Sequence, residues 1–195
     1  MPINTPNILT LIRILIIPVI IVVYFVPSRS ANEIVTFLFV LAAITDWLDG
    51  YLARRWNRWL ALRAFLDPVA DKLIVATALI LLASDRVVLE LVYSKILFTI
   101  VTCVIIGREI TISALREWMA GIGARSSVAV GMIGKIKTGV QMVAISMLLY
   151  HDPLWGLPVF KVGEIALYAA AALTLWSMFV YLRAAWPTLV DEGAA

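Results

Sequence analysis

The sequence predicts an all-α integral membrane protein, folded as a single bundle of six transmembrane helices. Composition is the first reason: 63% of the 195 residues are hydrophobic and 15% are charged, and the mean hydropathy is +0.97. A soluble domain is nearer half apolar and about one quarter charged. The apolar surplus argues against a soluble enzyme, a nucleic-acid-binding domain and a disordered chain. The length leaves room for one membrane-embedded domain, residues 1–195.

Six stretches are long enough to cross a bilayer, since a helix needs about 20 mostly apolar residues to span about 30 Å of hydrocarbon. In chain order they cover residues 8–26, 34–56, 68–84, 91–119, 131–150 and 162–183. Turn-forming residues end the first, third, fourth and fifth stretches, at 27–30, 84–86, 121–123 and 151–158. The second and third are separated by charge, an arginine-rich link from Arg54 to Arg63. This link predicts an antiparallel hairpin of the second and third helices.

The distribution of Lys and Arg orients the bundle. Eight basic residues fall in or beside the links after the second and fourth helices: Arg54, Arg55, Arg58, Arg63, Arg116, Arg125, Lys135 and Lys137. Four fall on the opposite side: Arg29, Arg86, Lys95 and Lys161. The positive-inside rule therefore places those two links, and both chain termini, in the cytoplasm.

Four aspartates lie where a membrane helix should avoid charge. Asp46, Asp49, Asp67 and Asp71 fall within one 26-residue window of the second and third helices. One aspartate at the centre of a membrane helix costs about 2.5–3.5 kcal/mol, so four could cost on the order of 10 kcal/mol. That is comparable to the whole stability of a domain. We therefore expect the four carboxylates to line a polar cavity at the cytoplasmic side or to hold cations.

The spacing of these aspartates favours a metal site. Asp46 and Asp49 share one helical face at i, i+3, and Asp67 and Asp71 share another at i, i+4. Pro68 after Asp67 predicts that the third helix starts here, with an N-cap and a proline in its first turn. Hard carboxylate oxygens suit Mg²⁺, Mn²⁺ or Ca²⁺, and two such ions balance four charges. The alternative is an interfacial network in which the acids pair with the neighbouring arginines.

A second polar set consists of cations inside the predicted bundle. Thr10 and Arg13 share a face of the first helix, while Arg108, Glu109 and Arg116 interrupt the fourth. Lys135 and Lys137 follow in the fifth. Singly, such a cation could be a snorkelling side chain, an interpretation that stays open for Lys137. Together, beside an acidic metal site, they predict a pocket for an anion.

The hairpin resembles the signature of the CDP-alcohol phosphotransferase family: D-x-x-D-G-x-x-A-R, eight residues, then G-x-x-x-D-x-x-x-D. The matching positions are Asp46, Asp49, Gly50, Ala53, Arg54, Asp67 and Asp71. Beyond the hairpin, residues 6–13, 113–119, 125–130 and 134–138 resemble bacterial members that transfer to a glycerol phosphate. The resemblance implies a membrane-bound enzyme of the bacterial inner membrane, commonly a homodimer, with its active site facing the cytoplasm.

The resemblance also implies roles for individual residues. Two divalent cations, Mg²⁺ or Mn²⁺, would be held by Asp46, Asp49, Asp67 and Asp71, and Asp71 would also act as the general base. The cytidine nucleotide would be bordered by Asp49, Gly50, Ala53 and Arg54. The candidates for binding the acceptor phosphate are Thr10, Arg13, Arg108, Arg116 and Lys135.

The implied reaction is transfer of the phosphatidyl group from CDP-diacylglycerol to sn-glycerol 3-phosphate, with release of CMP. One alternative is the same chemistry with another alcohol, such as inositol phosphate, serine or phosphatidylglycerol. A different class is a divalent-cation transporter that uses the aspartates as its pathway. A transporter predicts acids across the membrane depth, whereas residues 35–43 and 73–82 are apolar.

One position departs from the family signature. Arg63 stands where the family has its second glycine, four residues before Asp67. Because glycine permits close approach of a nucleotide to the backbone, we expect Arg63→Gly to keep the fold and to raise turnover or CMP affinity. Steady-state kinetics and CMP binding test this expectation, and equal values for the two proteins would show that the arginine is harmless.

Overall fold

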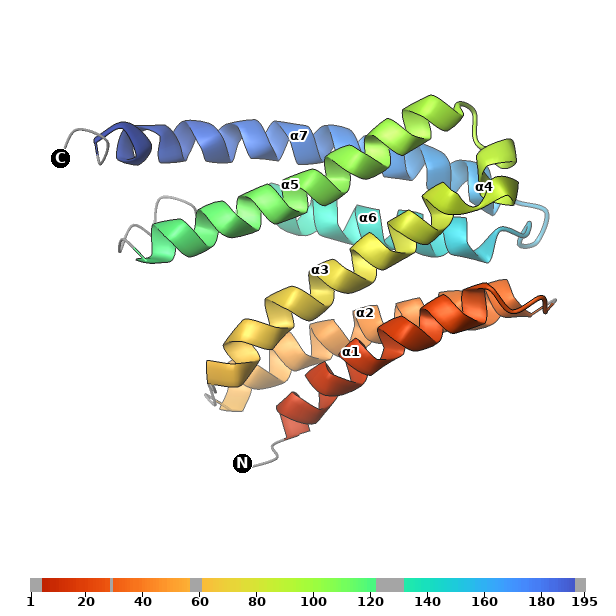
Figure 1. Ribbon diagram of the computed structural model, residues 1–195, viewed down its shortest axis with the longest axis horizontal. Helices are drawn as coiled ribbons and strands as arrows, with labels where there is room; N and C mark the ends of the chain where they lie inside the picture. The colour runs from red at the N-terminus through yellow and green to blue at the C-terminus, as the bar shows by residue number, and fades with distance from the viewer. Residues whose placement is uncertain (1–4, 29, 57–60, 122–131, 192–195) are drawn as a thin grey trace.

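The computed structural model describes residues 5–28, 30–56, 61–121 and 132–191, and its regular structure there is helical (Figure 1). The helices are α1 (Thr5–Tyr24), α2 (Ala31–Trp56), α3 (Ala61–Ser84), α4 (Arg86–Leu91), α5 (Lys95–Gly121), α6 (Met132–Tyr150) and α7 (Val159–Asp191). Six of them are long, and each long helix overlaps one of the predicted stretches in order. The predicted all-α class is confirmed in these ranges.

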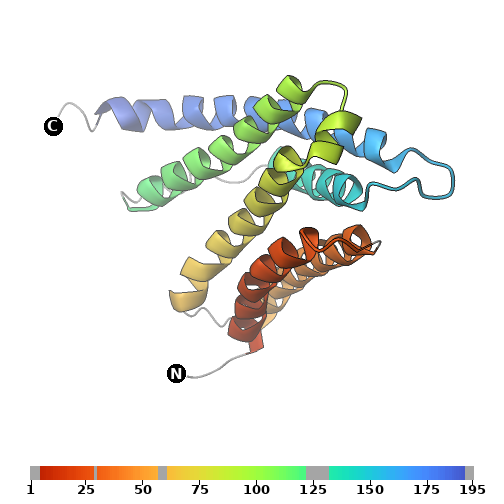
Figure 2. The same ribbon diagram turned by 45° about the vertical axis from the view of Figure 1, so that its right-hand side comes forward.

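The long helices form two packed groups, which are connected by contacts of α3 with α5 and α6 and of α2 with α6. α1 and α2 lie side by side, α6 packs closely on α7, and α3 contacts α1, α5 and α6. Figures 1 and 2 show both termini at one end of the bundle. The C-terminal ends of α2 and α5 and the N-terminal ends of α3 and α6 lie at the same end. A continuous apolar core joins the groups through Ile20, Phe39, Leu79, Ile145 and Leu148. The second and third predicted helices are therefore part of one bundle, in which both contact α1.

Two carboxylates accept hydrogen bonds that link helices at the opposite end of the bundle. Asp85 caps α4 by accepting a hydrogen bond from the backbone N–H of Val87, and it accepts another from the Tyr24 hydroxyl at 2.8 Å. Glu164 is buried and accepts hydrogen bonds from the Tyr93 backbone N–H at 2.7 Å and the Tyr168 hydroxyl at 2.8 Å. These contacts tie α1 to the start of α4, and the turn between α4 and α5 to α7.

The outer surface of the bundle is apolar. Among the described residues, two helical segments are long and apolar enough to cross a membrane, Lys95–Gly121 and Val159–Arg183. Every long helix also exposes large apolar side chains, among them Leu15, Phe37, Ile80, Ile96, Val143 and Phe179. Water would disfavour such a surface, whereas lipid hydrocarbon solvates it.

The predicted start of the third helix is wrong. α3 begins at Ala61, so Asp67 and Pro68 lie within the helix and not at its N-cap and first position. Residues 61–66 (Ala-Leu-Arg-Ala-Phe-Leu) contain mostly strong helix formers. Membrane helices tolerate an internal proline because neighbouring groups satisfy the freed backbone carbonyl. The extension adds more than one turn to the helix that carries Asp67 and Asp71.

α6 and α7 pack tightly at Gly163. A Cβ at this position would lie 2.7 Å from Cβ of Met147 and 3.1 Å from the Ala144 carbonyl oxygen. We expect Gly163→Ala to separate the two helices and to destabilise the protein by about 1–3 kcal/mol, as overpacked cores do. A thermal-unfolding midpoint in detergent measures the effect.

Gly139→Ala is the matched control on α6, because no atom lies within 4 Å of a Cβ there. The control should hold or raise Tm, since alanine favours a helix over glycine by about 1 kcal/mol. A Gly163→Ala protein that melts with the control would contradict tight packing of α6 on α7.

Candidate active site

A buried arginine joins two of the predicted aspartates. Nη1 of Arg13, on α1, donates to a carboxylate oxygen of Asp46 on α2 at 3.0 Å and of Asp71 on α3 at 2.7 Å. The arginine side chain is 1% exposed, while each carboxylate side chain is 43% exposed. Thr10 is also buried, one turn before Arg13 on the same helix. Three helices thus converge on one guanidinium.

The geometry leaves these carboxylates accessible. Both approach the same nitrogen, so they lie close together, and each carboxylate side chain is 43% exposed. Asp49 lies one turn after Asp46 on α2, and Asp67 lies one turn before Asp71 on α3. The donor set consists of hard oxygens, as Mg²⁺ and Mn²⁺ prefer. Within the described side chains, no three Asp, Glu, His or Cys residues form a metal-binding group.

A second charged cluster joins α5, α6 and α7. Glu109 accepts a hydrogen bond from Arg108 Nη1 at 3.3 Å and pairs with the ammonium of Lys137 on α6. Arg108 Nη2 donates to the Ser177 hydroxyl of α7 at 2.8 Å. Arg108 and Lys137 are both buried. Lys137 is therefore not a snorkelling side chain: it is a buried ion-pair partner.

Tyr181 of α7 lies beside both arginines of this cluster. Its ring centroid is 5.9 Å from Cζ of Arg108 and 5.1 Å from Cζ of Arg116, distances typical of cation–π contacts. Its hydroxyl accepts a hydrogen bond from Arg116 Nη2 at 3.1 Å. The Nε atoms of Arg108 and Arg116 are buried and have no hydrogen-bond partner among the described residues. The tyrosine fixes two guanidiniums that retain the capacity to donate.

The charges of this cluster do not cancel. It contains three cations, Arg108, Arg116 and Lys137, and one carboxylate, Glu109, which leaves two net positive charges in the described part of the site. A phosphate monoester carries about −1.5 to −2 charges near pH 7. The cluster is therefore suited electrostatically to a phosphorylated ligand.

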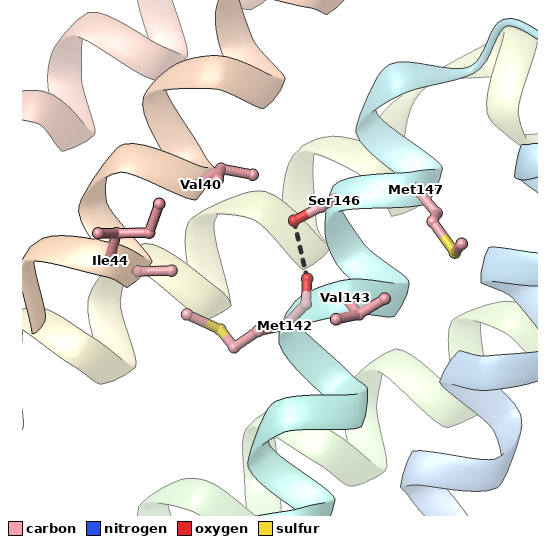
Figure 3. A pocket seen from close by; sticks show the side chains of 7 residues that line it. Val40, Ile44, Met142, Val143, Ser146 and Met147 are labelled. Carbon is pink, nitrogen blue, oxygen red and sulfur yellow. Dashed lines mark hydrogen bonds between the residues drawn. The ribbon is translucent and has the colours of Figure 1, made fainter. Parts of the chain in front are cut away.

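An apolar cavity of about 380 Å³ lies between α2 and α6 (Figure 3). Its lining comes from Val40, Ala43 and Ile44 on α2 and from Met142, Val143, Ser146 and Met147 on α6. The one hydroxyl in this lining, of Ser146, donates to the backbone carbonyl of Met142 at 2.9 Å. The cavity thus offers hydrocarbon contacts, and Ile44 lies two residues before Asp46 on α2.

The predicted site residues fall into three sets. The structure brings Thr10, Arg13, Asp46 and Asp71 together at one place, and it brings Arg108 and Arg116 together at another. The remaining predictions lie outside the described side chains: Asp49, Gly50, Ala53, Arg54, Arg63, Asp67 and Lys135. Arg13 contacts the aspartates, and its role toward the acceptor phosphate stays a prediction.

Sequence reasoning assigned no site role to Ser177 or Tyr181, and it left Lys137 open. Ser177 and Tyr181 are four residues apart on α7, and Arg108 and Arg116 are eight apart on α5. Both spacings mark a single helical face. Those spacings were the available signal, but only the contact between α5 and α7 shows that the two faces meet.

Comparisons with known proteins show the family to which the chain belongs. The model of the CDP-alcohol phosphatidyltransferase family matches residues 3–176. A curated CDP-diacylglycerol–glycerol-3-phosphate 3-phosphatidyltransferase from Salmonella choleraesuis (strain SC-B67) is 47% identical over 192 residues, which cover 98% of this chain and 100% of the relative. The protein of the same name from Escherichia coli (strain K12) is 46% identical with the same coverage. The chain therefore belongs to the CDP-alcohol phosphatidyltransferase family, as its aspartate signature predicted.

Proposed function

We propose that the protein transfers the phosphatidyl group of CDP-diacylglycerol to sn-glycerol 3-phosphate, giving phosphatidylglycerophosphate and CMP. The observation that carries this proposal is the cluster of two net positive charges formed by Arg108, Glu109, Arg116 and Lys137, because it fits an acceptor that bears a phosphate. The names of the near-full-length relatives support the same acceptor. Serine needs fewer cations, so the cluster favours glycerol 3-phosphate over that alternative.

The two carboxylates held by Arg13 act on the reacting groups. Asp71 accepts the proton of the 1-hydroxyl of glycerol 3-phosphate, and that oxygen attacks the lipid-bearing phosphorus of CDP-diacylglycerol. The bond from this phosphorus to the CMP oxygen breaks, and CMP leaves. Arg13 Nη1, at 2.7 Å from Asp71, fixes the orientation of the base. The exposure of the carboxylate leaves room for the acceptor hydroxyl.

Members of this family generally depend on divalent cations, and the donor set fits that requirement. In our proposal Asp46, Asp49, Asp67 and Asp71 hold two ions, Mg²⁺ or Mn²⁺. Bound there, such ions supply charge neutralisation for the pyrophosphate and for the leaving nucleotide phosphate. Gly50, Ala53 and Arg54, which follow Asp49 on α2, border the nucleotide.

The proposal also assigns a place to the lipid part of the donor. The apolar cavity between α2 and α6 is suited to an acyl chain, since its lining lacks a free polar group.

The six long helices cross a bacterial inner membrane with both termini and the aspartates on the cytoplasmic side. Exposed apolar side chains on every long helix support six spans. In this proposal residues 1–195 form one catalytic domain, and two copies form a homodimer.

The first test is CMP release by purified protein with CDP-diacylglycerol and glycerol 3-phosphate. Release should require the acceptor and Mg²⁺ or Mn²⁺, and should stop when a chelator removes the metal. Asp71→Asn should lower kcat by about 10²–10⁴-fold, the usual range for loss of a general base.

Asp152→Asn is the control for this test, because Asp152 is exposed in the turn between α6 and α7, at the opposite end of the bundle. It should retain wild-type kcat. Acceptor-independent release of CMP, or full activity in Asp71→Asn, would contradict the proposed reaction.

A second test concerns the acceptor. Arg116→Ala removes a guanidinium that Tyr181 holds, so KM for glycerol 3-phosphate should rise about tenfold or more, as expected for a charge-assisted hydrogen bond. KM for CDP-diacylglycerol should change little. The exposed Arg183→Ala on α7 serves as the control for loss of a nearby positive charge. Equal effects of the two variants would show that the cluster does not bind the acceptor.

A further inference from the structure

Lys72 lies between the two charged groups of the site. It directly follows Asp71 on α3, the helix that contacts α1 on one side and α5 and α6 on the other. Successive residues of a helix point about 100° apart. Asp71 meets Arg13 of α1, while the Lys72 ammonium donates a hydrogen bond to the Ser113 hydroxyl of α5. One turn of α3 thus faces both the aspartates and the cation cluster.

Ser113 places this ammonium beside the cation cluster. It lies four residues after Glu109 and three before Arg116, so the three side chains share one face of α5. Lys72 therefore adds a positive charge at the edge of the cluster nearest to Asp71.

The Lys72 charge lacks a compensating acid. It is half-buried, its hydrogen bond is to a neutral hydroxyl, and no carboxylate pairs with it among the described residues. Desolvating an ammonium is costly unless an anion accompanies it. Glu109, the acid on the neighbouring turn of α5, is already shared by Arg108 and Lys137. The ammonium is thus positioned to accept an anionic ligand.

We propose that Lys72 binds the phosphate of the acceptor and thereby selects phosphorylated alcohols. Glycerol 3-phosphate is short, so its hydroxyl reaches Asp71 only if its phosphate is held nearby. A cation on the residue next to the base meets this requirement, and Arg116 contacts the phosphate from the other side. This inference rests on the proposed function and adds the residue that links the base to the anion pocket.

Lys72→Met tests the proposal, because it keeps the length of the side chain and removes its charge. We expect KM for glycerol 3-phosphate to rise about tenfold or more, with little change in KM for CDP-diacylglycerol. Lys72→Arg keeps the positive charge, so its KM for glycerol 3-phosphate should stay close to the wild-type value. Ser113→Ala removes the helix contact but keeps the ammonium, so it should affect this KM less than Lys72→Met does.

A binding measurement tests the same point without turnover. Glycerol 3-phosphate should raise Tm of the wild-type protein, since a ligand that binds the folded state stabilises it, and should raise Tm of Lys72→Met much less. Free glycerol is the control ligand, and Thr111→Ala, at an exposed position of α5, is the control variant.

Two results would overturn the assignment. One is a Lys72→Met protein that retains wild-type KM and the wild-type Tm shift. The other is a Ser113→Ala protein with losses as large as those of Lys72→Met, which would make the contact a tie between helices. Failure of the proposed function is a separate outcome: the wild-type protein would bind glycerol 3-phosphate but release no CMP with it.

Discussion

The hydrogen bonds of one buried guanidinium hold together the two described aspartates of the family signature. Arg13 is 1% exposed and lies within 3.0 Å of carboxylates from two other helices. A buried charge that loses its partner typically costs about 3–5 kcal/mol, so Arg13, Asp46 and Asp71 stabilise one another only while α1, α2 and α3 stay packed together. The site and the fold of the first three helices are therefore one energetic unit. The cost of placing acids in a membrane bundle is partly offset by this arrangement.

The cluster around Arg108 has a net charge of the opposite sign to that of the Arg13 group. Arg13 and its two carboxylates carry one net negative charge, which suits metal cations, whereas Arg108, Glu109, Arg116 and Lys137 carry two net positive charges, which suit a phosphate. Neither group is neutral by itself, and the buried Nε atoms of Arg108 and Arg116 have no hydrogen-bond partner among the described residues. The two excess charges have opposite sign and lie on helices that α3 connects. In the proposed reaction, this separation orients a short acceptor, with its hydroxyl toward the aspartates and its phosphate toward the cations.

Much of the architecture was predictable from the sequence, because long apolar stretches and charged breaks mark membrane helices directly. The proximity of the acids of the second and third helices was anticipated from helical spacing and from a short link, whereas the contact of Arg13 with Asp46 and Asp71 was not. Pro68 misled the prediction, since its preference for a helix start was outweighed by the helix formers before it. Tyr181, Ser177 and Lys137 were not assigned for another reason. Their role depends on which faces of α5, α6 and α7 meet, and sequence periodicity does not encode that.

In the proposed reaction, the residues that select the acceptor are separate from Asp46 and Asp71. Asp46 and Asp71 lie on α2 and α3, whereas the cations that fit the acceptor lie mainly on α5 and α6 and are held in place by α7. A substitution at Ser177 or Tyr181 alters the orientation of Arg108 or Arg116 and leaves the Arg13 contacts intact. α3 is the exception, since it carries Asp71 toward one group and Lys72 toward the other. In the proposed reaction, acceptor binding and catalysis are therefore coupled through that helix, and changes in acceptor should be found first on the faces of α5 and α7 that α3 does not contact.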